Sequence, residues 1–418
     1  MRAQLDSPVA AYYLVLGSTA ALTLIGLVMV LSSSSIESYR ATQNSFSVFG
    51  KQAVWAAIGI PLAFLATRVP VRFWKRAAWP LLGVAVVALL LVFTSLGSES
   101  HGNRNWISFG GMTAQPSEAA KLALVIWAAA VLARKQSVLH HSVHAIVPVV
   151  FPGAMILVGL ILLGSDLGTT MIILALLAAL LWVAGAPARL FVLGGAVAAA
   201  GIVAISQTKS SRMNRINDWL TGTCDRTTLK TNADYVSSCW QSVHGRWALA
   251  SGGWWGVGLG GSREKWSWLP EAHNDFIFAI IGEELGLAGS LVVLGLFALL
   301  GIGLFLVVLR TEDPFVKIAT GGVIAWVLGQ VLINIGAVLG MVPVIGVPLP
   351  LLSSGGSALV TTLVALGMVI GFARGVPGAP EALSARAGVV RRSLAVVPGV
   401  RSRRAGRPGV AAPRSGVR

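Results

Sequence analysis

The longest polar passage embedded in apolar sequence runs over residues 266–286. Five ionisable residues lie within fourteen positions of it, and four of them are acidic: Glu271, His273, Asp275, Glu283 and Glu284. Asp275 is followed at once by six apolar residues, which predicts that its carboxylate lies at the boundary of an apolar environment. Burial there disfavours the ionised form and raises the pKa, as suits a general base. The passage therefore indicates acid–base chemistry centred on Asp275.

The neighbouring ionisable residues allow two interpretations. A solvated loop could explain Glu271 and His273. Glu283 and Glu284 lie two helical turns beyond Asp275, either deeper in the same helix or in an element that folds back. Buried acids paired with Arg or Lys are as good an explanation for them as catalytic acids.

A second cluster of polar residues covers 102–108 and 115–121. Gln-Pro-Ser-Glu at 115–118 reads as a helix start, with proline in the first turn and Glu118 favoured by the helix dipole. Glu118 and Lys121 are three residues apart and share a helix face. They form either a structural ion pair or a site in which Lys121 binds a phosphate, with Arg104 in the same cluster.

Two further clusters precede apolar runs. Asp166, in 164–170, could cap the next helix, because an aspartate there accepts the free amide protons, and capping is compatible with an additional site role. Asn334 and the turn Ser354, Gly355, Gly356 and Ser357 precede the last apolar run. Backbone amides at a helix entry can hold an anion such as a pyrophosphate, and an ordinary glycine-rich turn is the alternative.

The composition shows which elements must position these residues. The chain has 418 residues, of which 55% are hydrophobic and only 11% charged, whereas soluble domains carry about 25% charged residues. The sequence therefore predicts a membrane protein.

Of the net charge of +16, residues 374–418 supply +9, from ten Arg against one acid. Arg beside a membrane marks the cytoplasmic side and adheres to anionic lipid, so we do not expect nucleic acid as a partner.

We predict an all-α polytopic membrane protein with about ten transmembrane helices, since about 20 apolar residues cross the hydrocarbon core. The expected spans are 12–32, 50–67, 78–94, 119–133, 145–163, 169–185, 189–206, 286–309, 316–340 and 355–373. Span one has no strongly basic leader and no cleavage site, so it is read as an uncleaved helix.

Basic residues in the short loops predict the orientation. Arg and Lys follow spans two, four, six, eight and ten, and all five positions fall on one side. Both termini are then cytoplasmic in the plasma membrane, and the loops 33–49, 95–118, 207–274 and 341–354 are extracytoplasmic. The large loop 207–274 separates spans seven and eight. Residues 1–374 form the membrane domain, and 375–418 form a basic tail that is expected to be disordered.

The sequence contains no P-loop, no dinucleotide-binding glycine motif, no H-E-x-x-H and no G-x-S-x-G. Any chemistry must therefore be driven by a preactivated substrate or by an ion gradient.

These clusters, in this order and among ten spans, resemble the SEDS family (shape, elongation, division and sporulation; FtsW/RodA) over about residues 12–374. The most specific parts are Pro-Glu-Ala-His-Asn-Asp-Phe-Ile-Phe-Ala-Ile-Ile-Gly-Glu-Glu-Leu-Gly at 270–286 and Pro-Leu-Pro at 348–350 with Ser-Gly-Gly-Ser at 354–357. The form at 270–286 looks more like the division branch, FtsW. The basic tail and the cysteine pair look like an actinobacterial branch.

The resemblance implies a peptidoglycan glycosyltransferase that polymerises lipid II at the division septum, inverting the anomeric carbon while undecaprenyl pyrophosphate leaves. Asp275 matches the family's proposed catalytic aspartate. The candidates for the leaving group are Arg104, Lys121, Ser354, Gly355, Gly356 and Ser357, and the supporting polar residues are Glu118, Asp166, His273, Glu283, Glu284 and Asn334. A divalent cation such as Mg²⁺ could bridge carboxylates and phosphates, and the sequence does not decide this. The implied partners are a class B penicillin-binding protein and other division proteins.

Two rival functions stay open, a lipid II flippase and a non-catalytic scaffold for the transpeptidase. A transporter favours inverted repeats and an ionisable site at the midplane, whereas this chain collects its polar clusters at one face.

Cys224 and Cys239 lie in the large loop predicted to be extracytoplasmic, where disulfides persist, so we expect a bridge between them, with two free thiols as the alternative.

Overall fold

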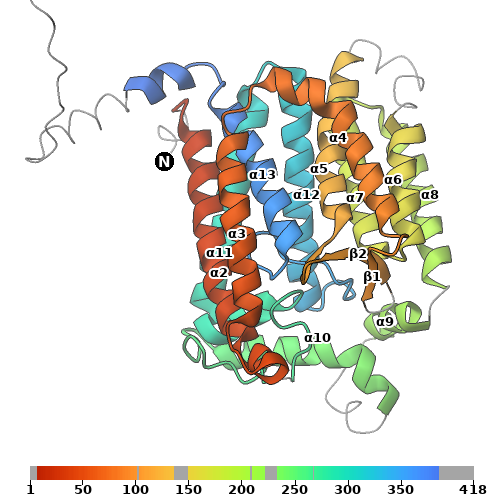
Figure 1. The fold of residues 1–418 in the computed structure, drawn as a ribbon, viewed down its shortest axis with the longest axis vertical. Coiled ribbons are helices and arrows are strands. Elements are labelled where there is room, and N and C mark those ends of the chain that lie inside the picture. The colour runs from red at the N-terminus through yellow and green to blue at the C-terminus, as the bar shows by residue number, and fades with distance from the viewer. Residues whose placement is uncertain are drawn as a thin grey trace, which may run out of the picture.

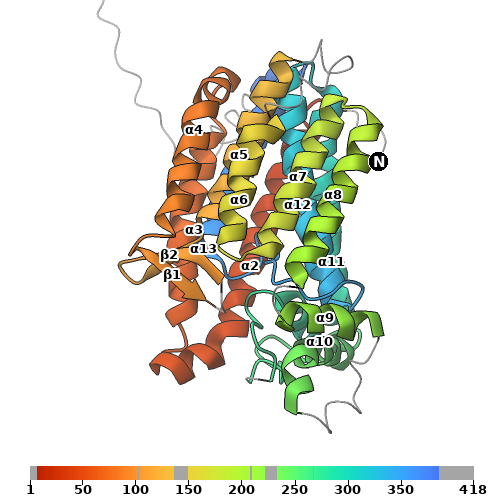
Figure 2. The ribbon, with the colours of Figure 1, turned by 90° about the vertical axis from the view of Figure 1, so that its right-hand side faces the viewer.

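The computed structural model describes residues 7–100, 103–135, 149–207, 210–221, 233–266 and 268–385. Within these ranges nine helices are long and apolar enough to cross a membrane: α2 (Ala10–Thr42), α3 (Ser47–Ala66), α4 (Val71–Leu91), α5 (Pro116–Arg134), α7 (Leu167–Ala184), α8 (Ala188–Ser206), α11 (Ile277–Arg310), α12 (Pro314–Val338) and α13 (Gly356–Ala373). The shorter apolar segment Val149–Leu163, made of η3 (Val149–Ala154) and α6 (Met155–Leu163), runs beside α5 (Figure 2). Nine of the ten predicted spans are therefore helices long enough to cross a membrane, and the fifth, 145–163, corresponds to this shorter segment in the described residues.

The helices run up and down in one bundle (Figure 1). The two ends of the bundle differ in the residues that they carry. At one end, the Arg310 guanidinium donates to the Ser7 carbonyl at 2.7 Å and Arg374 donates to the Thr67 carbonyl at 3.4 Å. We call this the basic end. The opposite end carries the three β-strands and the helices of the large loop, and we call it the loop end.

The first helix is longer than predicted. The segment 33–49 was expected to be a loop, and this was wrong for residues 33–42, because α2 continues to Thr42. Serine and threonine hydroxyls in α2 donate back to carbonyls of the preceding turn, as at Thr42, which donates to Ser38 at 2.9 Å. Ser32 donates to the Glu284 carboxylate. A tertiary partner and local hydrogen bonds thus extend a helix whose apolar pattern has already ended.

A small antiparallel sheet, which the sequence pattern does not predict, lies between α4 and α5. Its strands are β1 (Gly97–Ser100), β2 (Asn103–Phe109) and β3 (Met112–Ala114), in the order β1-β2-β3. Gly110 and Gly111 join β2 to β3 with φ of 58° and 79°. Positive φ at both positions is what a two-residue hairpin turn needs, and glycine adopts it without strain. The sheet holds Arg104 at the loop end.

The large loop between α8 and α11 is partly helical. Helices α9 (Ser210–Thr221) and α10 (Ala233–Gly252) lie across the loop end (Figures 1 and 2). The Trp219 indole donates to the Gly340 carbonyl at 3.1 Å, and Arg215 donates to the Val344 carbonyl at 3.5 Å. These contacts bring α9 against the segment between α12 and α13.

Helix α11 begins nine residues before the predicted span, and it is broken at Gly286, where φ is 70° and ψ is −167°. Its first part, residues 277–285, therefore has its own direction and follows directly from Asp275. We call this part the half-helix. The sequence left two arrangements open for Glu283 and Glu284. In the structure they lie at the end of the half-helix, which starts at the loop end and breaks just after them.

The expected disorder of the tail does not apply to its first residues. Val376 and Ala379 are buried, and residues 379–385 are helical. The remainder of the predicted tail, residues 386–418, lies outside the described residues.

Candidate functional site

Asp275 lies at the loop end, in the last turn before the half-helix. The side chain is half-buried and lines a small cavity together with residues of α12 and of the segment 344–347. The backbone is held by Asn334 of α12, whose amide nitrogen donates to the carbonyls of Asp275 at 2.7 Å and Val347 at 2.8 Å. Two separate elements therefore meet at the residue that the sequence singles out.

The carboxylate of Asp275 has an unusual environment. Within the described ranges, no residue donates a hydrogen bond to it. Burial raises its pKa to about 7, the nearby Glu271 carboxylate adds to this shift, and Arg215 and His273 oppose it. A carboxyl group with a pKa near neutrality and no internal donor can exchange a proton with a bound molecule.

The loop before α13 is tied to the residues that precede Asp275. The Ser353 hydroxyl donates to the Asn274 carbonyl at 2.6 Å, and the Ser354 amide donates to the His273 carbonyl at 2.9 Å. The Gly355 amide donates to the Gln52 side chain at 3.2 Å. The amides of Ser354 and Gly355 are therefore engaged within the protein, which corrects the expectation that they are free to hold an anion.

The other two residues of the predicted anion loop begin α13. A Cβ on Gly356 would lie 2.0 Å from the ring of Trp55, so the glycine allows this ring to pack on the helix start. The Ser357 hydroxyl accepts from the Gln115 amide at 3.0 Å. The amides at Gly356 and Ser357 point out of the helix N-terminus, where the helix dipole favours an anion.

Asp166 caps α7, as one of the two sequence interpretations has it. Its carboxylate accepts from the Thr169 amide at 2.9 Å and from the Thr169 hydroxyl at 2.8 Å. It also accepts from Asn105 at 2.7 Å and from Gln115 at 2.9 Å. Four donors satisfy the carboxylate and join α7 to the sheet and to the start of α5.

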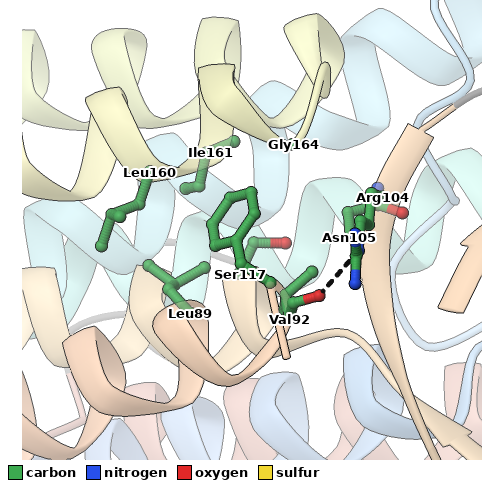
Figure 3. Close-up of a pocket in the computed structure, with 9 residues that line it drawn as sticks. Leu89, Val92, Arg104, Asn105, Ser117, Leu160, Ile161 and Gly164 are labelled. Carbon is green, nitrogen blue, oxygen red and sulfur yellow. Dashed lines mark hydrogen bonds between the residues drawn. The ribbon is translucent and has the colours of Figure 1, made fainter. Parts of the chain in front are cut away.

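Arg104 lies in the same neighbourhood, on β2. Its guanidinium donates to the carbonyls of Val92 at 3.1 Å and Thr94 at 2.9 Å, at the end of α4. Figure 3 shows the side chain among the residues that line a small pocket between β2, α4, α5 and α6. The residue is exposed, so its charge is accessible at the loop end even though two of its donors are occupied.

Lys121 and Glu118 form a buried ion pair. Their charged atoms are 2.8 Å apart, and the side chains are 1% and 3% exposed. The Lys121 ammonium also lies 5.1 Å from the centre of the Trp326 ring, in a cation–π contact. The structure thus has the structural ion pair of the two alternatives, and it does not present Lys121 to solvent as a phosphate ligand.

Glu283 and Glu284 are also fully engaged. Glu283 accepts from the Ser262 hydroxyl and from the Arg263 amide at 2.9 Å. Glu284, which is 0% exposed, accepts from Lys265 at 2.9 Å and from Ser32 of α2. Both acids hold the half-helix to the segment 262–265, which we call the strap. Glu284 matches the interpretation as a buried acid paired with Lys or Arg, whereas Glu283 is held by a hydroxyl and a backbone amide without a cation.

Several residues that hold the site were not predicted. Arg215 faces Asp275 from α9, Lys265 neutralises Glu284, and Glu37 lies 3.1 Å from the His273 ring nitrogen. Gln52 and Gln115 each bridge two helices. They lie far from their partners in the sequence, so only an isolated polar residue in or beside an apolar run could have indicated them.

Two predictions are not decided by the structure. In the described ranges, no group of three His, Cys, Asp or Glu side chains is placed to hold a metal ion. Cys224 lies outside the described residues, while Cys239 is buried on α10. The disulfide between them stays a prediction.

The comparisons with known proteins identify the family of this chain. A family model described as a cell cycle protein, for FtsW, RodA and SpoVE, matches residues 12–376. A probable peptidoglycan glycosyltransferase FtsW of Mycobacterium tuberculosis is 40% identical over 386 residues, which are 92% of this chain and 71% of that protein. Stage V sporulation protein E of Bacillus subtilis is 33% identical over 362 residues, which are 85% of this chain and 95% of that protein.

Solved structures show the same fold. A chain of a peptidoglycan synthase complex superposes with a TM-score of 0.69 at 27% identity, covering 86% of this chain and 97% of that one. The rod shape determining protein RodA of Thermus thermophilus superposes with a TM-score of 0.62 at 26% identity, covering 87% and 97%. With ten apolar segments and a match over most of its length, this chain is a multi-pass membrane protein that belongs to the FtsW, RodA and SpoVE family.

Proposed function

We propose that this protein is a peptidoglycan glycosyltransferase that polymerises lipid II into glycan strands. The observation that supports this most is the Asp275 carboxylate, which lies in a small cavity at the loop end without a donor from the described residues. The relatives named peptidoglycan glycosyltransferase, and the synthase complex with the same fold, support the substrate class.

In the proposed reaction, the acceptor sugar's 4-hydroxyl attacks the anomeric carbon of the donor. A new bond joins the acceptor oxygen to that carbon, and the bond from the carbon to the lipid pyrophosphate breaks with inversion. The hydroxyl proton passes to Asp275, which acts as general base. The pyrophosphate already carries the activation, so the reaction needs no nucleotide.

The leaving pyrophosphate needs positive charge or oriented dipoles. The N-terminus of α13, at Gly356 and Ser357, offers such a dipole, and Arg215 offers an exposed cation on the Asp275 side. Arg104 is exposed at the same end and stays a candidate. Lys121 is a weaker candidate because Glu118 already neutralises it inside the bundle.

The proposal includes an orientation. Arg310, Arg374 and the other basic residues of the short loops collect at the basic end, which is the expected cytoplasmic side. The loop end, with Asp275, then faces the extracytoplasmic side, where lipid II is polymerised. We further propose a division septum role and a class B penicillin-binding protein as partner.

The decisive test is polymerisation of lipid II by the purified protein together with its cognate transpeptidase, whose active serine is replaced. We expect glycan strands from the wild-type protein and none above background from the Asp275→Asn variant at equal protein amounts. Absence of strands from an intact, monodisperse wild-type complex supplied with Mg²⁺ would overturn the proposal.

One observation favours the flippase alternative. The Glu118–Lys121 pair is a buried ionisable pair in the first two turns of α5, and buried ionisable groups between membrane helices are typical of transport pathways. Movement of labelled lipid II across vesicles that contain only this protein, lost in a Glu118→Gln variant and unaffected by Asp275→Asn, would support transport. A protein that neither polymerises nor transports lipid II, yet binds the transpeptidase, would be a scaffold.

A further inference from the structure

The segment between α10 and the strap exposes two tryptophans side by side. It reads Gly-Gly-Trp-Trp-Gly-Val-Gly-Leu-Gly-Gly over 252–261, and we call it the Trp loop. Trp254 is 71% exposed and Trp255 is 83% exposed. A water-facing loop rarely displays two adjacent indoles to this extent, so the surface needs an occupant.

The Trp loop does not extend freely from the molecule, because its backbone fills the break in α11. The amides of Val257 and Gly258 donate to the carbonyls of Glu283 and Glu284 at 2.9 and 3.0 Å. On the other side of the break, the amides of Leu287 and Ala288 donate to the carbonyls of Gly253 and Trp254 at 2.9 and 3.1 Å. The loop thus supplies the hydrogen bonds that an unbroken helix would have made itself.

Glycines make this close fit feasible. A Cβ on Gly256, where φ is 78°, would lie 2.1 Å from the Glu284 carbonyl oxygen. A Cβ on Gly286 would lie 2.4 Å from the Gly256 nitrogen. The two backbones are therefore packed closely together, and the main chain that carries the two indoles is held beside Leu287.

The surface next to the Trp loop is the lipid-facing side of α11. Leu287, Leu291 and Val292 are exposed by 43%, 54% and 58%, and they continue the same apolar strip along the helix from the point where Trp254 is bonded. Arg263, two residues beyond the loop, is exposed as well. Tryptophan beside arginine, at the end of a lipid-facing helix, is the residue pattern of a membrane–water interface.

We propose that Trp254 and Trp255 anchor the Trp loop in the headgroup region of the bilayer. The indole rings lie among the upper acyl chains and glycerol groups, with their N–H groups toward the headgroups. Because the Trp loop is bonded to both sides of the helix break, the anchor fixes the depth of the half-helix, which begins two residues after Asp275. A protein partner seated on the same indoles is the competing occupant, and the experiment distinguishes the two.

The test measures depth directly, in vesicles of phosphatidylglycerol and phosphatidylethanolamine that contain this protein alone. Trp254→Cys and Trp255→Cys are labelled separately with a nitroxide, without reductant, and the unsubstituted protein serves as the blank. Val292→Cys is the lipid control, and Glu99→Cys, at an exposed acid of the outer sheet, is the aqueous control. For each label, collision with oxygen is compared with collision with a water-soluble nickel chelate.

We expect both loop labels to collide more with oxygen than with the nickel chelate, at a shallower depth than Val292 and opposite to Glu99. Labels that behave like Glu99 would overturn the anchor and leave the indoles as a surface for a protein partner. If the cysteine variants do not fold, the Trp254→Phe, Trp255→Phe double variant replaces them. Brominated lipid should then quench the fluorescence difference between wild type and this variant, and an unquenched difference would equally overturn the proposal.

Discussion

Asp275 and Glu284 are nine residues apart at the same end of the molecule, and their surroundings are opposite. Glu284 is fully buried and accepts hydrogen bonds from a lysine and a serine. Asp275 is half-buried, and within the described part of the chain its carboxylate has no donor. One acid has its charge compensated by the protein, while the other has a raised pKa and free acceptor atoms.

The difference separates three acids that are engaged within the protein from one whose carboxylate stays available. Glu283, Glu284 and Asp166 each join two or more elements through their carboxylates, and every one of their carboxylate oxygens already accepts a hydrogen bond from the protein. Asp275 is positioned through its backbone carbonyl instead, by Asn334. The structure therefore holds the main chain of Asp275 firmly and leaves the side chain available.

The largest expected effect comes from removing the available carboxylate. Asp275→Asn keeps the size and the backbone contact with Asn334 but removes the proton acceptor. General-base loss costs about 10² to 10⁴ in rate, so lipid II polymerisation should fall by that factor. Thermal stability should not fall below that of wild type, because the variant lacks the cost of ionising a buried carboxyl group, and partner binding should stay near wild type. A stable variant that polymerises at the wild-type rate would remove Asp275 from the chemistry.

Changes at the Glu284 ion pair should lower the free energy of unfolding. Lys265→Met leaves the Glu284 carboxylate buried without its cation, which typically costs about 3 to 5 kcal/mol of the free energy of unfolding. The double variant Lys265→Met, Glu284→Gln should recover a large part, because no unpaired charge is left. Denaturant unfolding in detergent measures both. A single variant that loses less than about 1 kcal/mol would mean that the pair behaves like an exposed one.

Asp166 should show a smaller loss of stability. Asp166→Ala removes the cap of α7 and leaves the amides of Asn105 and Gln115 without their acceptor, which together cost about 1 to 3 kcal/mol. Asp166→Asn is the matched control, since it keeps one oxygen for the Thr169 amide and should lose less. Equal losses in the two variants would show that the charge, and not the cap, stabilises this site.

The pH dependence sharpens the comparison further. The ionised form of Asp275 is the base, so kcat/KM for polymerisation should rise with pH up to about 7 and level off above it, by about tenfold per pH unit at the acid side. A folded pKa above the unfolded value of about 3.9 means that the folded state binds the proton more tightly. The free energy of unfolding should therefore fall as pH rises from about 4 to about 7.

Asp275→Asn should lack this slope in unfolding free energy, whereas Glu284→Gln should keep it. A wild-type rate profile that is already flat above pH 5 would contradict the raised pKa of Asp275.

Much of the fold could be predicted because membrane spans carry a local signal. Runs of about 20 apolar residues identify helices from their own composition, and most predicted ends lie within a few residues of the observed ones, as for α7 and α13. Polar clusters beside these runs identified Asp275 and the cap at Asp166, because a polar residue at the edge of an apolar segment is unusual wherever it occurs.

The sequence by itself therefore located the nine spanning helices and the shorter apolar segment, the end at which the polar residues collect, and the acid that we propose for proton transfer. Only the tertiary structure decided which acids are neutralised. Lys265 and Ser32 reach Glu284 from segments 19 and 252 residues away. The Trp loop supplies the backbone hydrogen bonds at the break in α11, and no local sequence pattern predicts this contact. A carboxylate is reactive or inert according to the donors that surround it, and chain segments far apart in the sequence bring those donors together.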